Sequence, residues 1–163
     1  MKIGLISDTH DNIQNIHKAI SVFNDKHVSL VIHAGDIVCP EAVEAFSGVK
    51  LIAVLGNNDL DKDGLTNAFD RIGGELKGEF YELVKDDLTF AIYHGTNSRR
   101  KESFIQSGKY DILVCGHTHR VQNKKVGKTL VVNPGTANGW FFGYSATVAV
   151  FDTKTRYAEL INL

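Results

Sequence analysis

The chain contains little cysteine and little proline, with two residues of each among 163, and it has one methionine and one tryptophan. The two cysteines, Cys39 and Cys115, show no Cys-x-x-Cys spacing. Cys115 lies in an apolar run, where a cysteine behaves as a small hydrophobic residue. We therefore expect the protein to belong to a reducing compartment.

A strong charge of either sign and a long hydrophobic run are also missing. The formal net charge is −1, so we expect no surface that neutralises many nucleic-acid phosphates. At the start, "MKIGLISDTH", Asp8 and His10 interrupt the apolar stretch too early for a signal-peptide core or a membrane span. We therefore expect a cytoplasmic protein without non-specific nucleic-acid binding or a membrane partner.

The length and composition are those of one ordinary soluble domain, for which we take residues 1–163. With 163 residues and 43% hydrophobic content, the chain can bury a sizeable core. The short apolar runs "KIGLIS", "LVIHAG" and "KLIAVLG" predict buried strands. Apolar residues at three- and four-residue steps predict a helix over 12–24, and Pro40 begins a shorter one that ends at Phe46. This alternation indicates parallel strands in an α/β fold.

The second half of the chain has a different pattern. The stretch from Asn57 to Gly74 is polar, and we predict no element in it. "EFYELVKDDLTFAIYHG" and "NKKVGKTLVVN" predict hairpins that turn at 86–87 and at Gly127. A short helix ended by Gly108, a strand at "DILVC" and two closing strands complete the prediction, with more antiparallel pairing than in the first half.

Polar side chains that could bind a metal follow the predicted strands, each at the point where a strand ends. They are Asp8, His10, Asp36, Asn57, His94, His117 and His119. A single histidine is more often a surface residue or a satisfied core group. In open α/β sheets, however, binding crevices form at the carboxyl edge of the strands, where these residues gather. If the backbone of "GHTH" is extended, His117 and His119 point to the same side.

The fragments "SDTH", "AGD", "GNND", "YHG" and "GHTH", in this order, resemble the calcineurin-like metallophosphoesterase superfamily. The resemblance spans Asp8 to His119, and the short length is most similar to the small single-domain prokaryotic phosphodiesterases. It implies an α/β fold of two mostly mixed β-sheets packed face to face, with helices outside in a four-layer αββα arrangement.

The resemblance also implies a role for each candidate ligand. One metal ion would be held by Asp8, His10 and His119, and Asp36 would bridge to the second. The second ion would be completed by Asn57, His94 and His117. Four imidazoles beside two carboxylates and one amide are too rich in nitrogen for Ca²⁺ or Mg²⁺ and suit Mn²⁺, Zn²⁺, Fe²⁺ or Ni²⁺, of which we favour Mn²⁺ or Ni²⁺.

The activity implied is hydrolysis of a small phosphodiester. Two such ions would share a hydroxide that attacks phosphorus in line, while they hold a phosphoryl oxygen. One position departs from the family pattern. Where many members have a histidine that faces the leaving group, this chain has Asn58, and an amide cannot donate a full proton.

Two other functions remain open. The same fold serves in the retromer coat as a non-catalytic scaffold, so a metal-binding or scaffold protein is one alternative. A phosphomonoesterase is the other. It would need extra cationic contacts, for which "SRRK" offers Arg99 and Arg100 as candidate substrate-binding residues, although such a run is more often a solvated face. The sequence does not determine the oligomeric state, and a homodimer is one possibility.

Several other features have a structural interpretation. His33 is either a core histidine or a hydrogen-bond partner of the site, whereas His17 and His27 are expected to be exposed. "NPGT" at 133–136 is expected to form a turn at the pocket rim. The aromatic residues of "NGWFFGY" are expected to pack in the core, or else to line the cleft or a dimer contact.

Overall fold

The computed structural model describes residues 1–139 and 143–163 and contains two β-sheets. The first is six-stranded, in the order β11-β10-β1-β2-β3-β4. Strands β1, β2, β3 and β4 are parallel, whereas β10 pairs antiparallel with both β1 and β11. The bounds are β1 Lys2–Ile6, β2 Leu30–His33, β3 Leu51–Ala53, β4 Glu75–Leu76, β10 Thr147–Asp152 and β11 Tyr157–Asn162.

The second sheet is five-stranded, in the order β5-β6-β7-β9-β8. Its central strands β6, β7 and β9 are parallel, and the two predicted hairpins, β5–β6 and β8–β9, add the antiparallel pairs. The bounds are β5 Phe80–Lys85, β6 Leu88–Tyr93, β7 Ile112–Val114, β8 Gln122–Val126 and β9 Thr129–Asn133. Both sheets are therefore mixed.

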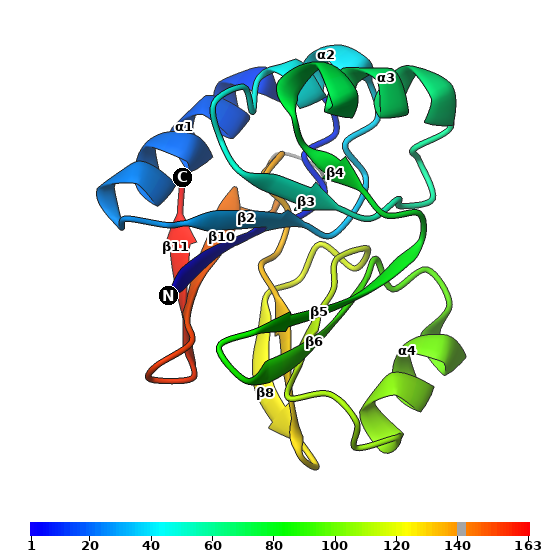
Figure 1. The fold of residues 1–163 in the computed structure, drawn as a ribbon, viewed down its shortest axis with the longest axis vertical. Helices are drawn as coiled ribbons and strands as arrows, with labels where there is room; N and C mark the ends of the chain where they lie inside the picture. Colours follow the sequence, from blue (N-terminus) through cyan, green and yellow to red (C-terminus); the bar gives the residue numbers. More distant parts are fainter. Residues whose placement is uncertain (140–142) are drawn as a thin grey trace.

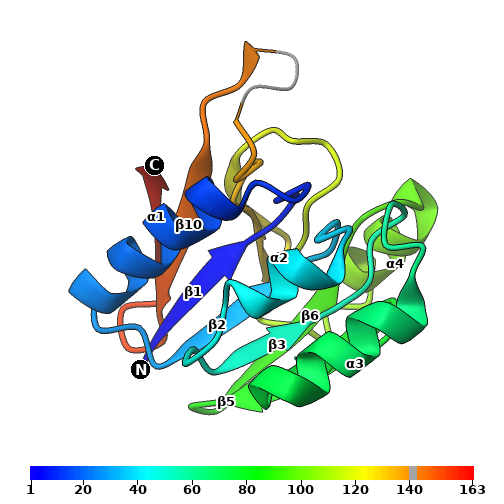
Figure 2. The ribbon, with the colours of Figure 1, turned by 90° about the horizontal axis from the view of Figure 1, so that it is seen from above.

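The sheets pack face to face, and the helices cover their outer faces (Figure 1). Apolar side chains from both sheets, among them Phe90 of β6 and Phe151 of β10, form the layer between them. Three helices, α1 Ile13–Asp25, α2 Pro40–Glu44 and α3 Lys62–Ile72, cover the first sheet (Figure 2). Helix α4, Ser98–Gln106, covers the second sheet. The predicted four-layer fold is confirmed.

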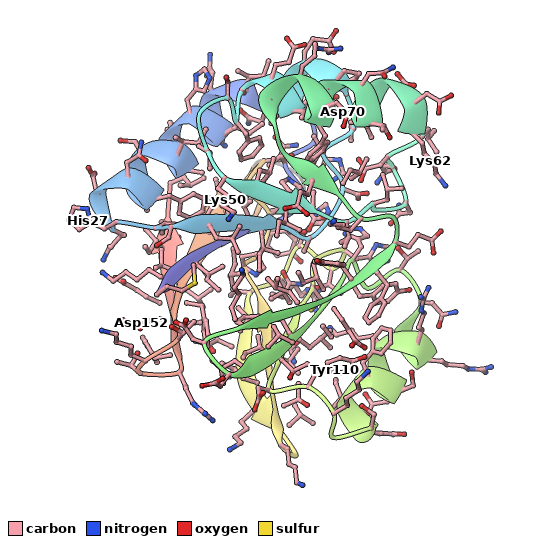
Figure 3. All side chains as sticks on the ribbon, viewed as in Figure 1. His27, Lys50, Lys62, Asp70, Tyr110 and Asp152 are labelled. Atoms are coloured by element: carbon pink, nitrogen blue, oxygen red, sulfur yellow. The ribbon has the colours of Figure 1, made fainter. Side chains whose placement is uncertain are left out.

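Helix α1 packs closely on β1 because the strand contains a glycine at the contact. A Cβ atom on Gly4 would lie 2.9 Å from the ring of Phe23. The apolar stripe of α1 buries Ile16, Ala19 and Phe23, while Asn12 caps the helix by accepting a hydrogen bond from Asn15 N. His17 and His27 are exposed as predicted, and Figure 3 shows His27 at the periphery beyond the end of α1.

The prediction that residues 57–74 contain no element was wrong, because α3 lies there. Asp61 caps α3 by accepting a hydrogen bond from Gly64 N, and Gly73 ends it with a left-handed backbone. Leu65, Ala68 and Phe69 form its buried face. These three apolar residues have helical spacing in the sequence, but the polar residues around them make the pattern weak. Within the described residues, no helix is long and apolar enough to cross a membrane.

Candidate metal centre

The candidate ligands lie in the loops that follow five strands of the two sheets. Asp8 and His10 follow β1, Asp36 follows β2, Asn57 follows β3, His94 follows β6, and His117 and His119 follow β7. The extended backbone expected for "GHTH" is wrong. Positive φ angles of 68° and 58° at His117 and His119 place both in the left-handed region. Asp8, His10 and Asp36 also have positive φ, so these loops turn tightly.

The first group of potential ligands consists of Asp8, His10 and His119, whose ligand atoms lie within 4.8 Å of one another. His119 Nε2 lies 3.2 Å from Asp8 Oδ1, and His10 Nε2 lies 3.9 Å from the same oxygen. The two imidazole nitrogens are 3.4 Å apart. This is the set expected for the first metal ion.

The second group consists of Asp8, Asp36 and His94, all of them buried. His94 Nε2 lies 3.3 Å from Asp36 Oδ2, and its Nδ1 is 2.8 Å from the backbone oxygen of Ala34. The backbone oxygen accepts, so Nδ1 carries the proton and Nε2 is free to bind a cation. Among the described residues, Asp8 Oδ1 and His94 Nε2 are the buried side-chain atoms without a hydrogen-bond partner. A cation between them would satisfy both, so these residues fit the metal ions that the sequence implies.

His117 and Asn57 lie at the edge of the second group. The His117 ring packs edge-on against His94, with 5.2 Å between ring centroids, and His117 is exposed. Asn57 is exposed as well, and its Oδ1 accepts a hydrogen bond of 3.4 Å from the Thr96 hydroxyl. Thr96 therefore orients the amide oxygen, the atom of Asn57 that would bind a cation.

Asn58 contacts the bridging carboxylate candidate. Its backbone N–H donates to Asp36 Oδ1 at 2.9 Å, and its side-chain Nδ2 donates to Asp36 Oδ2 at 2.7 Å. Sequence reasoning placed Asn58 only toward a leaving group and missed this contact. The carboxamide holds the orientation of Asp36.

The orientation of Asp8 is fixed by hydrogen bonds that the sequence did not predict. Ser7 Oγ donates to Asp8 Oδ2 at 2.6 Å, and His117 N donates to the same oxygen at 3.1 Å. The turn at 133–136 supports the backbone, because Thr136 Oγ1 donates to the carbonyl oxygen of Asp8 at 2.9 Å. The turn is buried and lies beneath Asp8, so its expected position at the pocket rim was wrong. The aromatic residues Trp140, Phe141 and Phe142 lie outside the described residues.

Asp59 is a second residue that the sequence analysis overlooked. It is buried, and its carboxylate accepts hydrogen bonds from three backbone N–H groups, those of Asp36, Val38 and Gly56, at 2.6–2.9 Å. It therefore ties the loop after β2 to the loop after β3, which carry Asp36 and Asn57. Its signal in the sequence was its place as the last residue of "GNND".

The arginines of "SRRK" differ in their surroundings. A hollow of about 270 Å³ beside Asn57 is lined by Arg100, Tyr93 and Glu79 and not by Arg99. A second hollow of about 670 Å³ lies beside His117 and His119. Both adjoin the candidate ligands.

The chain is similar to known phosphoesterases. Residues 1–156 match the model of the calcineurin-like phosphoesterase superfamily domain. The chain belongs to this family. It is 40% identical to a phosphodiesterase of Methanocaldococcus jannaschii, over 99% of each chain.

Solved structures support the same assignment. The metallophosphoesterase chain superposes on an archaeal phosphodiesterase with a TM-score of 0.94 and 38% identity, covering all of both chains. The phosphoesterase YfcE of E. coli and Vps29 of Chaetomium thermophilum each give a TM-score of 0.73, at 17% and 14% identity. The matches cover 99% of this chain and, respectively, 99% and 95% of the other. At these identities, the last two structures show only that the fold is shared.

The electrostatics of the metallophosphoesterase site favour a bound positive charge. Burial alone would raise the pKa of Asp36, but His94 beside it holds this pKa well below its usual range. Burial alone would lower the pKa of His94, yet Asp36 and Asp8 raise it. The nearby carboxylate of Asp8 raises the pKa of His119, whereas burial lowers that of His117. Protons therefore compete with cations for these ligands, and metal affinity should fall as the pH falls.

His33 supports the centre from the core. Gly35 N donates to His33 Nδ1 at 3.1 Å, so Nε2 carries the proton and donates to Thr9 Oγ1, also at 3.1 Å. Thr9 in turn donates to the backbone oxygen of Asp36 at 3.4 Å. His33 is fully buried, and of its two expected roles the structure shows both.

We predict that His33 makes stability depend on pH. Burial lowers its pKa from 6.5 to about 4. Between these two values the unfolded chain binds a proton that the folded chain does not. The free energy of unfolding should therefore fall by about 3 kcal/mol as the pH falls from 6.5 to 4. Urea unfolding at several pH values, with a chelator present, measures this change.

His33→Asn is the matched control, because its amide oxygen can accept from Gly35 N and the side chain does not titrate. The variant should lose that part of the pH dependence and keep the part due to other groups. Equal pH dependence in the two proteins would contradict the assignment.

Proposed function

We propose that this chain is a dinuclear metal-dependent phosphodiesterase, formed as one domain by residues 1–163. The observation that carries the proposal is the pair of buried, unpartnered atoms, Asp8 Oδ1 and His94 Nε2, at the centre of the ligand cluster. The relative from M. jannaschii supports the reaction type, since it is named a phosphodiesterase and matches nearly the whole chain.

Each ligand has a place in this proposal. Asp8, His10 and His119 would hold one ion, and Asp36 would bridge to the other. Asn57, His94 and His117 would complete the second. The nitrogen-rich donor set favours Mn²⁺ or Ni²⁺, with Zn²⁺ and Fe²⁺ as further candidates.

When bound, the two cations supply Lewis acidity that activates a water nucleophile and neutralises charge on the phosphoryl group. The chain's own residues position that chemistry. Asn58 and Asp59 fix Asp36 from two sides, so the geometry is set before substrate arrives. With two divalent cations against two carboxylates, the site would be positive and attract a small phosphodiester anion for in-line attack.

Other functions are less well supported. All seven candidate ligand positions hold residues that can bind a metal, which disfavours a scaffold without metal. A phosphomonoesterase needs further cations to bind its extra charge, and Glu79, 3.5 Å from Arg100, offsets the charge of the arginine that lines the hollow beside Asn57. The two free thiols, Cys39 and Cys115, favour a reducing, cytoplasmic compartment. Non-specific nucleic-acid binding remains unexpected at this net charge, and a homodimer is compatible with the proposal.

The direct test is hydrolysis of bis(4-nitrophenyl) phosphate by metal-stripped protein. Mn²⁺ or Ni²⁺ should restore activity, and Mg²⁺ should restore little, because hard oxygen ligands are too few. His117→Ala should lower kcat by about 10²-fold or more, since it removes one ligand of the second ion. His17→Ala on α1, also an exposed histidine, should behave as wild type.

The protein could bind two ions and still show no activity with Mn²⁺, Ni²⁺, Zn²⁺ or Mg²⁺. That result would reject the phosphodiesterase function and favour the scaffold function. Full activity in His117→Ala would reject its assignment as a ligand.

We further propose that the chain lacks a general acid for the leaving group, because Asn58 stands where many relatives have histidine. Aryl diesters should then react best. Asn58→His should increase the rate on a cyclic nucleotide, whose leaving group is an alkoxide, by about 10²-fold relative to the aryl substrate. The ratio of the two rates separates this effect from the lost contact with Asp36. An unchanged ratio would exclude the idea.

A further inference from the structure

The residues that line the hollow beside Asn57 favour one kind of substituent on the substrate. Its volume is about 270 Å³, and it lies between the loop after β3 and the start of α4. The buried side chains of Leu55 and Tyr93 contribute apolar surface. Glu79 and Arg100 contribute charge, and Thr96, Asn97 and Asn57 contribute hydrogen-bonding groups; all of these residues line the hollow. Because Asn57 is also a candidate metal ligand, the hollow adjoins the proposed centre.

Arg100 is held in place by aromatic rings. Its guanidinium carbon lies 5.1 Å from the ring centre of Tyr93 and 5.8 Å from those of Phe80 and Phe104. Its side chain keeps 44% of its surface exposed. A guanidinium fixed on aromatic rings and still accessible is a stacking surface for another planar group.

Charge argues against a second phosphate in this hollow. Glu79 Oε2 lies 3.5 Å from Arg100 Nη1, so the pair has no net charge. An additional phosphate would meet the carboxylate as well as the guanidinium. A neutral group with both donors and acceptors would instead find an acceptor in Glu79 and donors in Arg100.

A phosphodiester carries two substituents, and the one that is not expelled must lie beside the metal centre. We propose that the hollow binds a nucleoside as this retained substituent, with its base against Arg100. The proposal rests on the phosphodiesterase function proposed above and assigns its substrate class, a nucleotide diester. Bases suit the hollow because they are planar, neutral and rich in hydrogen-bonding edges.

Two substrates with the same leaving group test the proposal. Thymidine 5′-(4-nitrophenyl phosphate) and methyl 4-nitrophenyl phosphate both release 4-nitrophenol and differ in the retained substituent. The ratio of their kcat/KM values should favour the nucleoside by about tenfold or more, which is the usual effect of stacking one base. In Arg100→Met the ratio should fall to near one, and in Arg100→Lys, which keeps the charge but not the plane, it should fall as well.

Arg99→Met is the matched control, because Arg99 is the neighbouring arginine and does not line the hollow. Its ratio should stay within about twofold of wild type. Calorimetric binding of thymidine 5′-phosphate, compared with methyl phosphate, gives a second readout. Wild type and Arg99→Met should prefer the nucleotide, and Arg100→Met should not.

The outcomes separate the two proposals. If neither ester is hydrolysed with Mn²⁺ or Ni²⁺, the phosphodiesterase function fails. If the methyl ester is hydrolysed and the wild-type ratio is near one, the function stands and the nucleoside site is rejected. If Arg120→Met, in the hollow beside His119, removes the preference and Arg100→Met keeps it, the nucleoside binds there and the inference is overturned.

Discussion

The carboxylate of Asp8 joins the two sheets at their shared edge, and the rest of the site depends on its position. Asp8 follows β1 of the first sheet, yet its Oδ2 accepts a hydrogen bond from His117 N, which follows β7 of the second. Its Oδ1 is left facing His119. A buried carboxylate with one oxygen satisfied and the other unpartnered is costly without a cation. Metal binding would therefore also lock the two sheets together.

Asp8 and Asp36 can take these positions only because the backbone of neighbouring loops comes very close to them. A Cβ atom on Gly116 would lie 1.8 Å from Ser7 Oγ, and one on Gly56 would lie 2.1 Å from Asp36 Oδ1. Only glycine lets these loops approach the carboxylates, which gives a physical reason for the glycine in "GHTH" and "GNND". Asp59 then fixes the loops by accepting three backbone hydrogen bonds.

The sequence predicted the parallel strands and both hairpins, because apolar runs that end in glycine are local signals. It also placed Asp8 and Asp36 together, since the ends of neighbouring parallel strands meet at one edge of a sheet. His94 follows a strand of the second sheet and reaches them through the packing of the two sheets. Helix α3 was missed because its apolar positions are few among polar residues. The roles of Asp59, Thr136 and Asn58 were missed for another reason. They contact loops that are far apart in the chain, and such contacts depend on tertiary packing, which a short sequence fragment does not reveal.

A crystal structure of the Mn²⁺-loaded protein would show whether these ligands bind two ions. Anomalous scattering should show two ions roughly 3.5–4 Å apart. Asp36 should lie between them, with His119 on the first ion and His117 on the second. A single ion held by Asp8, His10 and His119, with Asn57 and His117 unliganded at saturating metal, would contradict the account.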